Sequence, residues 1–507
     1  MKKILALTLA LIMVLGMFAG CKPNTVEKAK EPLGAGLTKE EKFAEHVTLT
    51  WCFPDARGAA DFSEWDRIVK AINEITEKEI NTTINIEVIP LGEYTNKMSM
   101  KFNANEKWDL CFTGAWNPYT SAVSMGVYEP LKQEYIDTYM ANSLGTMNPL
   151  YKEAMTVNGE IYGFPIQQIY VRQSGMRFET DWAKEVGFDY TQVKELTDLE
   201  PYFDALLAKG YTECFFSAGD DLMTNLVSYL GIDPLVDAMT PGVVEYRDET
   251  CKVINQYESA QFLELAKLMK KWYDKKYFTS GALTGEQDNP IFEEDRHPVD
   301  INPAYKPGGD AESSRSYGLE IKTIPFGDAV LTSSAIQMTA MAVSVNCEYP
   351  GRAMAFIDLL NTNEELLNLV CWGQEDIDWK WVDKENKLIE IQEGAYPGNY
   401  AFLVGNTFIT YHTDETQVGT WEETIAINEA ADGSSILGFT FDATNVSGEL
   451  ANVSAILPEH LNSILCGMAE GSVEDAIAAM NAALYQAGLQ TVLDEMQRQV
   501  DAWKASK

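Results

Sequence analysis

The first 21 residues indicate the cellular compartment in which the rest of this chain folds. Lys2 and Lys3 precede a continuous apolar stretch, residues 4–18, which ends in Ala19 and Gly20. A charged start, an apolar middle and small residues at the end are typical of a secretory signal peptide. The stretch is shorter than the roughly 20 residues that a membrane-spanning helix needs. We therefore expect residues 1–20 to be removed and the mature chain to act outside the cytoplasm.

Cys21 follows the apolar stretch directly, and polar residues follow Cys21. A cysteine in this position is typical of bacterial lipoproteins, in which it is diacylated and becomes the first residue of the mature chain. Two acyl chains hold a protein on a membrane far more durably than one chain does. The sequence thus predicts a lipid anchor at Cys21 on the extracellular face of the cell membrane. Ordinary signal cleavage near Ala19 is the alternative.

The charge of the chain excludes several kinds of partner. It has 39 basic and 76 acidic residues, a formal net charge of −37. Losing Lys2 and Lys3 with the signal peptide makes the mature chain more acidic still. Such a surface repels nucleic acid and anionic lipid headgroups. We expect no nucleic-acid partner, a monomer, and membrane attachment through the lipid anchor only.

Cysteine and histidine spacing gives no support for a disulfide framework, a metal site or a cofactor. The seven cysteines after Cys21 are an odd, widely spaced set without a C-x-x-C pair. We expect them to be small buried residues, with one bridged pair as the alternative. The four histidines lie far apart, and neither a phosphate-binding loop nor a G-x-S-x-G elbow occurs. No catalytic residue, metal or cofactor is therefore predicted.

Hydrophobic spacing predicts a parallel α/β arrangement in the first third of the chain. Alternation over 47–51 is followed by a helical pattern over 62–75, a strand over 84–88, a helix over 94–102 and a strand over 108–113. Strands that alternate with helices form parallel sheets. In open sheets of this kind ligands sit beyond the carboxyl ends of the strands. Those ends are predicted at 51–57 and 112–117, and Asn158-Gly159 predicts a later hairpin turn.

Several stretches, in this order, resemble the extracellular solute-binding proteins of ABC importers, of the sugar-binding family 1 type. They are LTWCFPDARG (49–58), WDLCFTGAWN (108–117), NGEIYGFP (158–165) and MAVSVNCEYPGRAMAFIDLLNTNEELLNLVCWG (341–373). LGFTFDATNVSGELANV (437–453) and the helices after it resemble the C-terminal domain of unknown function of the LipO-like lipoprotein group. The resemblance implies an α/β, two-lobed periplasmic-binding-protein-like fold, with a ligand cleft between lobes joined by crossing strands. It also implies that the cleft closes on the ligand and performs no chemistry on it.

The domain organisation expected from these patterns has five parts. They are a signal peptide (1–20), a tether (21–45), lobe 1 (46–163 and 321–372), lobe 2 (164–320 and part of 373–436) and a C-terminal helical domain that packs on the lobes (437–507).

Aromatic and polar residues near the predicted strand ends supply candidates for the ligand site. Sugar rings need flat aromatic surfaces with a few converging polar groups, and carboxylates and Arg make charge-assisted hydrogen bonds to hydroxyls. Packing within the core or loop capping is the alternative for Trp116, Asp55 and Trp372. The predicted ligand-binding residues are Phe53, Asp55, Arg57, Trp116, Asn117, Tyr170, Arg172 and Trp372.

The function expected from the resemblance is capture of a small ligand, an oligosaccharide in particular, and its delivery to the permease subunits of an ABC importer. A surface glycan hydrolase is one alternative, but it would need two carboxylates at a defined separation, and the sequence nominates none. A sensory or adhesive lipoprotein is the other, because a fold does not fix its use.

Overall fold

The structure of the protein, a computed structural model, describes residues 27–57, 64–117, 119–211, 214–215, 220–278, 281, 298–393, 396, 398 and 400–507. The predicted signal peptide and Cys21 lie outside these residues. The chain divides into two compact units, which confirms the two-lobed expectation. Unit 1 comprises Met1–Thr146, Glu160–Phe164 and Ala340–Val370, and unit 2 comprises Met147–Gly159, Pro165–Thr339 and Cys371–Lys507.

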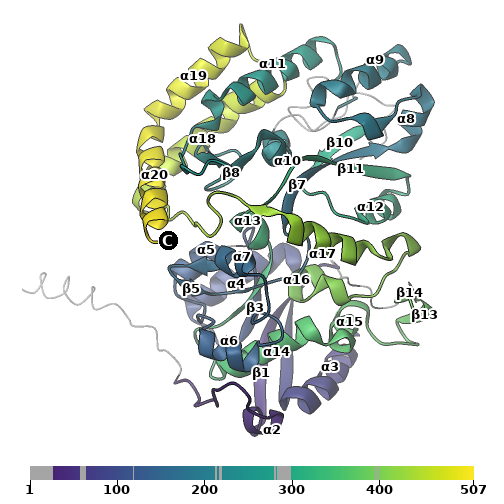
Figure 1. Ribbon diagram of the computed structural model, residues 1–507, viewed down its shortest axis with the longest axis vertical. Helices are drawn as coiled ribbons and strands as arrows, with labels where there is room; N and C mark the ends of the chain where they lie inside the picture. The colour runs from purple at the N-terminus through teal and green to yellow at the C-terminus, as the bar shows by residue number, and fades with distance from the viewer. Residues whose placement is uncertain are drawn as a thin grey trace, which may run out of the picture. The chain divides into compact units, whose positions relative to one another are not determined.

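Unit 1 contains the predicted α/β sheet, a five-stranded sheet in the order β2-β1-β3-β12-β6. Figure 1 labels two of its strands, β1 and β3. Its strands are β1 (Val47–Asp55), β2 (Thr82–Pro90), β3 (Leu110–Thr113), β6 (Phe164–Pro165) and β12 (Ala340–Val343). β1 runs parallel to β2 and β3, as the spacing predicts, whereas β12 is antiparallel to β3. The carboxyl ends of β1 and β3 therefore lie at one edge of the sheet.

Amphipathic helices cover this sheet and complete the core of unit 1. In α3, one helical face with Trp65, Ile68 and Ile72 is buried. Trp51 of β1 is fully buried, and its ring meets the Phe356 ring edge-on at 5.3 Å. The helices are α2 (Lys39–Lys42), α3 (Glu64–Ile80), α4 (Leu91–Ala104), α5 (Tyr119–Ser124), α6 (Gln133–Tyr139), α14 (Pro350–Thr362) and the first part of α15 (Glu364–Trp372).

Unit 2 is built on a four-stranded sheet in the order β10-β7-β11-β15. Its strands are β7 (Val171–Glu179), β10 (Val299–Asn302), β11 (Ile321–Leu331) and β15 (Asp432–Gly433). β11 pairs antiparallel with β7 from Ile321 to Leu331, with a bulge between Phe326 and Val330. The assignment of residues 321–339 to lobe 1 was therefore wrong, because the ladder joins residues 321–331 to β7 and residues 332–339 belong to unit 2 with them.

Short hairpins and many helices complete unit 2. The hairpins are β8 (Ile232–Pro234) with β9 (Val243–Glu245) and β13 (Trp379–Asp383) with β14 (Leu388–Ile391). The predicted Asn-Gly turn is confirmed between β4 (Thr156–Val157) and β5 (Glu160–Ile161), with positive φ at Asn158 and Gly159. The α-helices are α7 (Pro149–Ala154), α8 (Thr180–Val186), α9 (Glu200–Ala208), α10 (Asp220–Leu230), α11 (Ala260–Asp274), α12 (Gly309–Tyr317), α13 (Ser333–Ile336), α16 (Ala401–Val404) and α17 (Thr420–Ala430). The 3₁₀ turns are η1 (Tyr190–Gln192), η2 (Leu196–Leu199), η3 (Gln256–Glu258), η5 (Thr407–Ile409), η6 (Glu415–Gln417) and η7 (Thr444–Val446).

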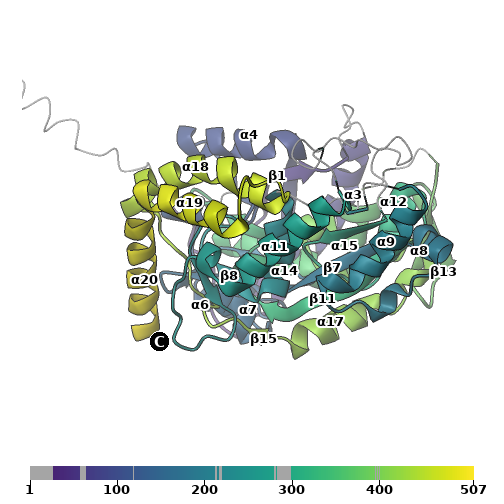
Figure 2. The same cartoon turned by 90° about the horizontal axis from the view of Figure 1, so that it is seen from above.

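The C-terminal helices pack into the apolar core of unit 2. α18 (Ser447–Leu465) and α19 (Val473–Gln486) lie beside α11 (Figures 1 and 2) and contribute to the same apolar cluster. A Cβ at Gly467 would lie 2.4 Å from the Met269 carbonyl oxygen, so only glycine allows this close approach. In α20 (Leu489–Ala505), Leu489, Val492, Met496 and Val500 form one buried face.

Residues 27–45 were predicted to be part of a structureless tether, and the structure shows them bound to unit 1 instead. They contain α2, which begins with a capping box between Thr38 and Glu41. Lys28 donates hydrogen bonds to the Val345 and Cys347 carbonyl oxygens. Apolar periodicity could not reveal this segment, since polar contacts hold it.

Three further expectations concern the described residues only. Within them, no helix is long and apolar enough to cross a membrane, and His, Cys, Asp and Glu side chains gather in no group of three suited to a metal ion. The seven cysteines after Cys21 are all buried and unbridged, which confirms their reading as small core residues.

Candidate functional site

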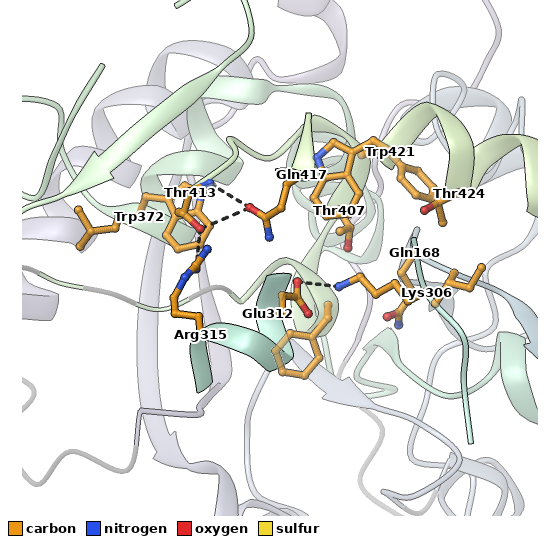
Figure 3. Close-up of a pocket in the computed structure, with 14 residues that line it drawn as sticks. Gln168, Lys306, Glu312, Arg315, Trp372, Thr407, Thr413, Gln417, Trp421 and Thr424 are labelled. Atoms are coloured by element: carbon orange, nitrogen blue, oxygen red, sulfur yellow. Dashed lines mark hydrogen bonds and ion pairs between the residues drawn. The ribbon is translucent and has the colours of Figure 1, made fainter. Parts of the chain in front are cut away.

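A cavity of about 650 Å³ lies in unit 2 (Figure 3). Its walls come from segments that are far apart in the sequence: the chain before β7, α12 with the turn before it, the end of α15, and residues between 391 and 424. The lining residues are Gln168, Ile169, Lys306, Glu312, Arg315, Trp372, Ile391, Phe402, Thr407, Phe408, Thr413, Gln417, Trp421 and Thr424.

Short capped turns hold much of this wall in place. The Asn406 side chain accepts a hydrogen bond from the Phe408 N–H at 3.0 Å and so starts η5. The Asp414 side chain accepts one from the Thr416 N–H at 2.9 Å and starts η6. Asn and Asp are among the best residues for this capping role. The caps fix Thr407 and Gln417 at the first or last residue of a turn, where their side chains reach the cavity.

The aromatic rings of the cavity differ in how much surface they offer. Phe402 on α16 is 38% exposed, whereas Trp421 is 7% exposed. His412 stacks on Trp421 at 5.5 Å, and the Lys306 ammonium lies 5.7 Å from the centre of the same ring. The Trp421 ring is thus already covered, whereas Phe402 is exposed and Phe408 is half-buried in the cavity wall.

Charged side chains of the cavity are paired with opposite charges. Arg315 donates to Thr413 Oγ1 at 3.0 Å and meets Asp414 Oδ2 at 3.3 Å. Lys306 Nζ lies 2.9 Å from Glu312 Oε1, and Figure 3 shows these two side chains pointing toward one another. These pairs leave no excess of positive or negative charge among the four groups, which favours an uncharged ligand.

Two buried polar atoms of the cavity wall are unpaired. Trp372 Nε1 and Thr407 Oγ1 have no hydrogen-bond partner among the residues that the structure describes, although both side chains are less than 8% exposed. By contrast, the Thr424 hydroxyl, also in the wall, donates to the Thr420 carbonyl oxygen at 2.7 Å. A buried polar atom without a partner costs folding free energy, and native proteins rarely leave one so.

His412 stacks on Trp421 in this region. Burial lowers the pKa of its imidazole, which favours the uncharged form of the ring. The nearby charged groups Glu422 and Lys387 act on it in opposite directions.

In unit 1, the predicted ligand residues Phe53 and Asp55 are buried, and the half-buried Arg57 pairs with Asp55. The Phe53 ring is fully buried and packs edge-on against Trp51 at 4.9 Å and against Trp65. Asp55, 1% exposed, accepts hydrogen bonds from the Arg57 guanidinium at 2.8 Å and from Trp65 Nε1 at 3.2 Å. This placement favours the alternative in which Asp55 stabilises the loop after β1.

The two residues predicted at the end of β3 have different environments. Trp116 is 47% exposed, with its ring 5.2 Å from the Phe112 ring. Asn117 is buried, and its Oδ1 accepts from Thr95 at 3.3 Å. Trp116 therefore has the open aromatic surface that a stacking residue needs.

Of the three predicted residues in unit 2, the structure brings Trp372 to the cavity. Tyr170 is buried and donates to the Pro165 carbonyl oxygen at 3.2 Å, so it belongs to the core. Arg172 donates to the Thr224 carbonyl oxygen at 2.9 Å, and burial lowers the pKa of its guanidinium. Neither lines the cavity.

Most residues of the cavity were missed by the sequence analysis. The missed signal is the run of aromatic, Thr and Gln residues between 402 and 421, since such residues suit sugar binding. Aromatic, Thr and Gln residues are common on ordinary protein surfaces. The run therefore indicates a ligand site only when α12 and Gln168 are known to lie opposite it.

Comparison with known proteins agrees with this architecture. Residues 435–505 match the family model described as a domain of unknown function, DUF3502. The chain is similar to a carbohydrate ABC transporter substrate-binding protein of Streptococcus pneumoniae serotype 4 (strain ATCC BAA-334 / TIGR4), with 26% identity over 457 residues, 87% of this chain and 89% of that protein.

Solved structures of one S. pneumoniae protein share the fold. The N-glycan transport solute binding protein (NgtS) has a TM-score of 0.77 at 23% identity, covering 91% of this chain and 99% of that chain. The same protein in complex with Man5GlcNAc has a TM-score of 0.66 at 23% identity over the same shares. The predicted resemblance is therefore confirmed: the chain has the two-domain fold of extracellular solute-binding proteins, and its last helices carry a DUF3502 domain.

Proposed function

We propose that this protein captures an oligosaccharide outside the cell and delivers it to the permease subunits of an ABC importer. The observation that carries the proposal is the cavity wall of unit 2, where an exposed Phe402 ring lies with the buried, unpaired polar atoms of Trp372 and Thr407. A sugar supplies what this wall lacks, because its ring has an apolar face and its rim donates and accepts hydrogen bonds. The volume of about 650 Å³ falls within the usual range of small-ligand sites.

The relatives support this choice of ligand class. The similar S. pneumoniae protein is named for carbohydrate transport, and NgtS has been crystallised with Man5GlcNAc. On unit 1, Trp116 remains a proposed stacking residue, because nearly half of its side chain is exposed.

A binding role is favoured over glycan hydrolysis by the carboxylates of the cavity. Glycosidases use a pair of carboxyl groups on either side of the scissile bond. Among the described residues that line the cavity, Glu312 is the one carboxylate, and Lys306 is paired with it. A sensory protein would bind the same ligand; two permease genes beside this gene favour an importer, and a histidine kinase gene favours a sensor.

Replacing Phe402 with Ala should weaken oligosaccharide binding about threefold to tenfold, the scale of an aromatic contact worth roughly 0.5–1.5 kcal/mol. The melting temperature should change little, because Phe402 is 38% exposed. Calorimetric titration measures the affinity, and Val418→Ala is the control, since Val418 is similarly exposed but lies outside the cavity wall. Equal affinities for Phe402→Ala and wild type would remove Phe402 from the site.

We further propose that Cys21 carries two acyl chains and holds the protein on the outer face of the cell membrane. Cys21→Ser should release the protein into the medium, because the acidic mature chain has no other attraction to anionic lipid. Cell fractionation measures the partition. Protein with Ser at residue 21 that still sediments with membranes would contradict the anchor.

A further inference from the structure

The segment that precedes β1 is fastened to unit 1 at several points along its length. At its start, Lys28 donates to the Val345 carbonyl oxygen at 2.6 Å and forms an ion pair with Glu129 at 3.0 Å. At its end, Arg352 donates to the Glu45 carbonyl oxygen at 3.0 Å. Such contacts are not expected of a flexible linker, so we call residues 28–45 the strap.

Glu31 makes the central contact of the strap. Its carboxylate accepts hydrogen bonds from the Gly351 N–H at 2.6 Å and the Arg352 N–H at 2.8 Å, in the first turn of α14. A carboxylate satisfies the free N–H groups of a helix start and interacts favourably with its dipole. The contact is closely packed, since a Cβ at Gly351 would lie 2.4 Å from the Tyr139 ring and 3.0 Å from Glu31 Oε2.

The middle of the strap adds contacts with α6. Tyr139 Oη donates to the Pro32 carbonyl oxygen at 2.7 Å, and the Gly34 N–H donates to Thr138 Oγ1 at 3.1 Å. We call the surface that receives the strap the anchor edge: Glu129, Thr138, Tyr139 and residues 345–352.

The strap limits the distance between Cys21 and the body of unit 1. Five residues, 22–26, separate Cys21 from the first described residue. Even a fully extended chain from 21 to 27 spans only about 20 Å, whereas a free tether from 21 to 46 would reach about 85 Å. A protein anchored at Cys21 is thus restrained to the bilayer along the anchor edge.

The net charge of the segment between Cys21 and β1 is compatible with a position near the membrane surface. Residues 22–45 contain five Lys and five Glu and are neutral, in a chain of net charge −37. Anionic headgroups would repel the acidic faces of the protein more strongly than they would repel this neutral segment.

We propose that the strap ties the lipid anchor to unit 1, so that the anchor edge with the strap on it faces the lipid headgroups and no flexible tether extends over the described residues 27–46. The proposed position against the membrane rests on the anchor at Cys21 proposed above, whereas the attachment of the strap to unit 1 does not. The two are therefore tested separately.

The strap is tested in the soluble full-length mature protein that carries Cys21→Ser. Trypsin should cut after Lys28, Lys30, Lys39 and Lys42 at least about tenfold more slowly in the folded protein than in a free peptide of residues 22–45 with the same sequence, because cleavage needs local opening. Glu31→Ala should abolish this protection and speed hydrogen exchange of the Gly351 and Arg352 amides. Glu40→Ala is the control, since Glu40 is an exposed strap residue. Equal protection in Glu31→Ala and wild type, or rapid wild-type cleavage throughout the strap, would overturn the strap.

The position against the membrane is tested with lipidated protein on vesicles that contain an acceptor-labelled headgroup lipid. A donor dye at Asp137→Cys, exposed beside Thr138, should transfer energy efficiently in the wild-type background. Transfer should fall when a 20-residue Gly/Ser segment is inserted between residues 26 and 27, or when Glu31→Ala and Lys28→Ala are combined. Equal transfer in all three proteins would overturn the proposal. Protein that fails to bind vesicles would contradict the anchor at Cys21, while the trypsin result would still decide the strap.

Discussion

Replacing Asp233 with Asn should remove a loss of folding stability that the wild-type protein suffers as the pH rises from about 4 to about 7. Asp233 of β8 is 4% exposed, and burial raises its pKa from 3.8 to about 7. Ser434 Oγ donates to its carboxylate at 2.5 Å, and Arg172 also favours the charged form, but neither outweighs burial. Tyr246, whose pKa burial also raises, is the other titratable group beside it.

The sign of the effect follows from proton binding. Between the unfolded pKa near 4 and the folded pKa near 7, the folded state holds a proton on Asp233 that the unfolded state has lost. Stability therefore falls with rising pH in this window and levels off above it. A difference of about three pKa units corresponds to on the order of 4 kcal/mol.

Urea unfolding at several values between pH 4 and pH 8 measures this dependence. Asn resembles the protonated carboxyl group, so Asp233→Asn should match wild type near pH 4 and exceed its stability at pH 8. Asp494→Asn, at an exposed position of α20, is the control and should leave the wild-type dependence unchanged. Parallel stability curves for wild type and Asp233→Asn would contradict a buried carboxyl that titrates near neutrality.

Replacing Thr407 with Val should weaken oligosaccharide binding and leave folding stability unchanged or higher. Thr407 Oγ1 is buried without a partner among the described residues, and Val keeps the shape while removing that unpaired atom. A ligand hydroxyl bonded to Oγ1 would lose its partner in the variant, at a cost of about 1–3 kcal/mol. This loss corresponds to roughly a tenfold to hundredfold change in affinity.

Thr424→Val is the matched control for this variant. Thr424 also lines the cavity, but its hydroxyl already donates to the Thr420 carbonyl oxygen. Its replacement should lower stability by about 1 kcal/mol and leave the affinity near the wild-type value. Titration calorimetry and thermal melting of both variants give the two quantities. A Thr407→Val protein that binds as wild type does, or that melts as Thr424→Val does, would contradict a ligand role for Oγ1.

The fold of unit 1 could be predicted because its signals are local. Alternation in β1 and the helical spacing of α3 each act over one element, and strand–helix–strand order fixes parallel pairing. The extent of unit 2 could not be predicted in the same way. Whether β11 pairs with β7 or joins the first sheet depends on contacts between residues about 150 positions apart.

The site was harder still to predict, because its wall joins side chains from distant segments. Trp372 was identified as a single aromatic residue after an apolar helix, but its neighbours Gln168, Arg315 and Thr407 come from three other parts of the chain. The strap was missed for a related reason. Lys28 and Glu31 look like residues of a solvated linker until their partners in α14 and the loop before it are known.

Oligosaccharide binding at the cavity of unit 2 can be measured by calorimetric titration of two proteins with one panel of neutral oligosaccharides, Man5GlcNAc among them. The proteins are wild type and the double variant Trp372→Phe/Thr407→Val, which removes both unpaired polar atoms. We expect wild type to bind at least one oligosaccharide, and the double variant, melting at a similar temperature, to bind it at least about tenfold more weakly. Binding of equal strength by both proteins, or no binding of any panel member by wild type, would rule out this cavity as an oligosaccharide site.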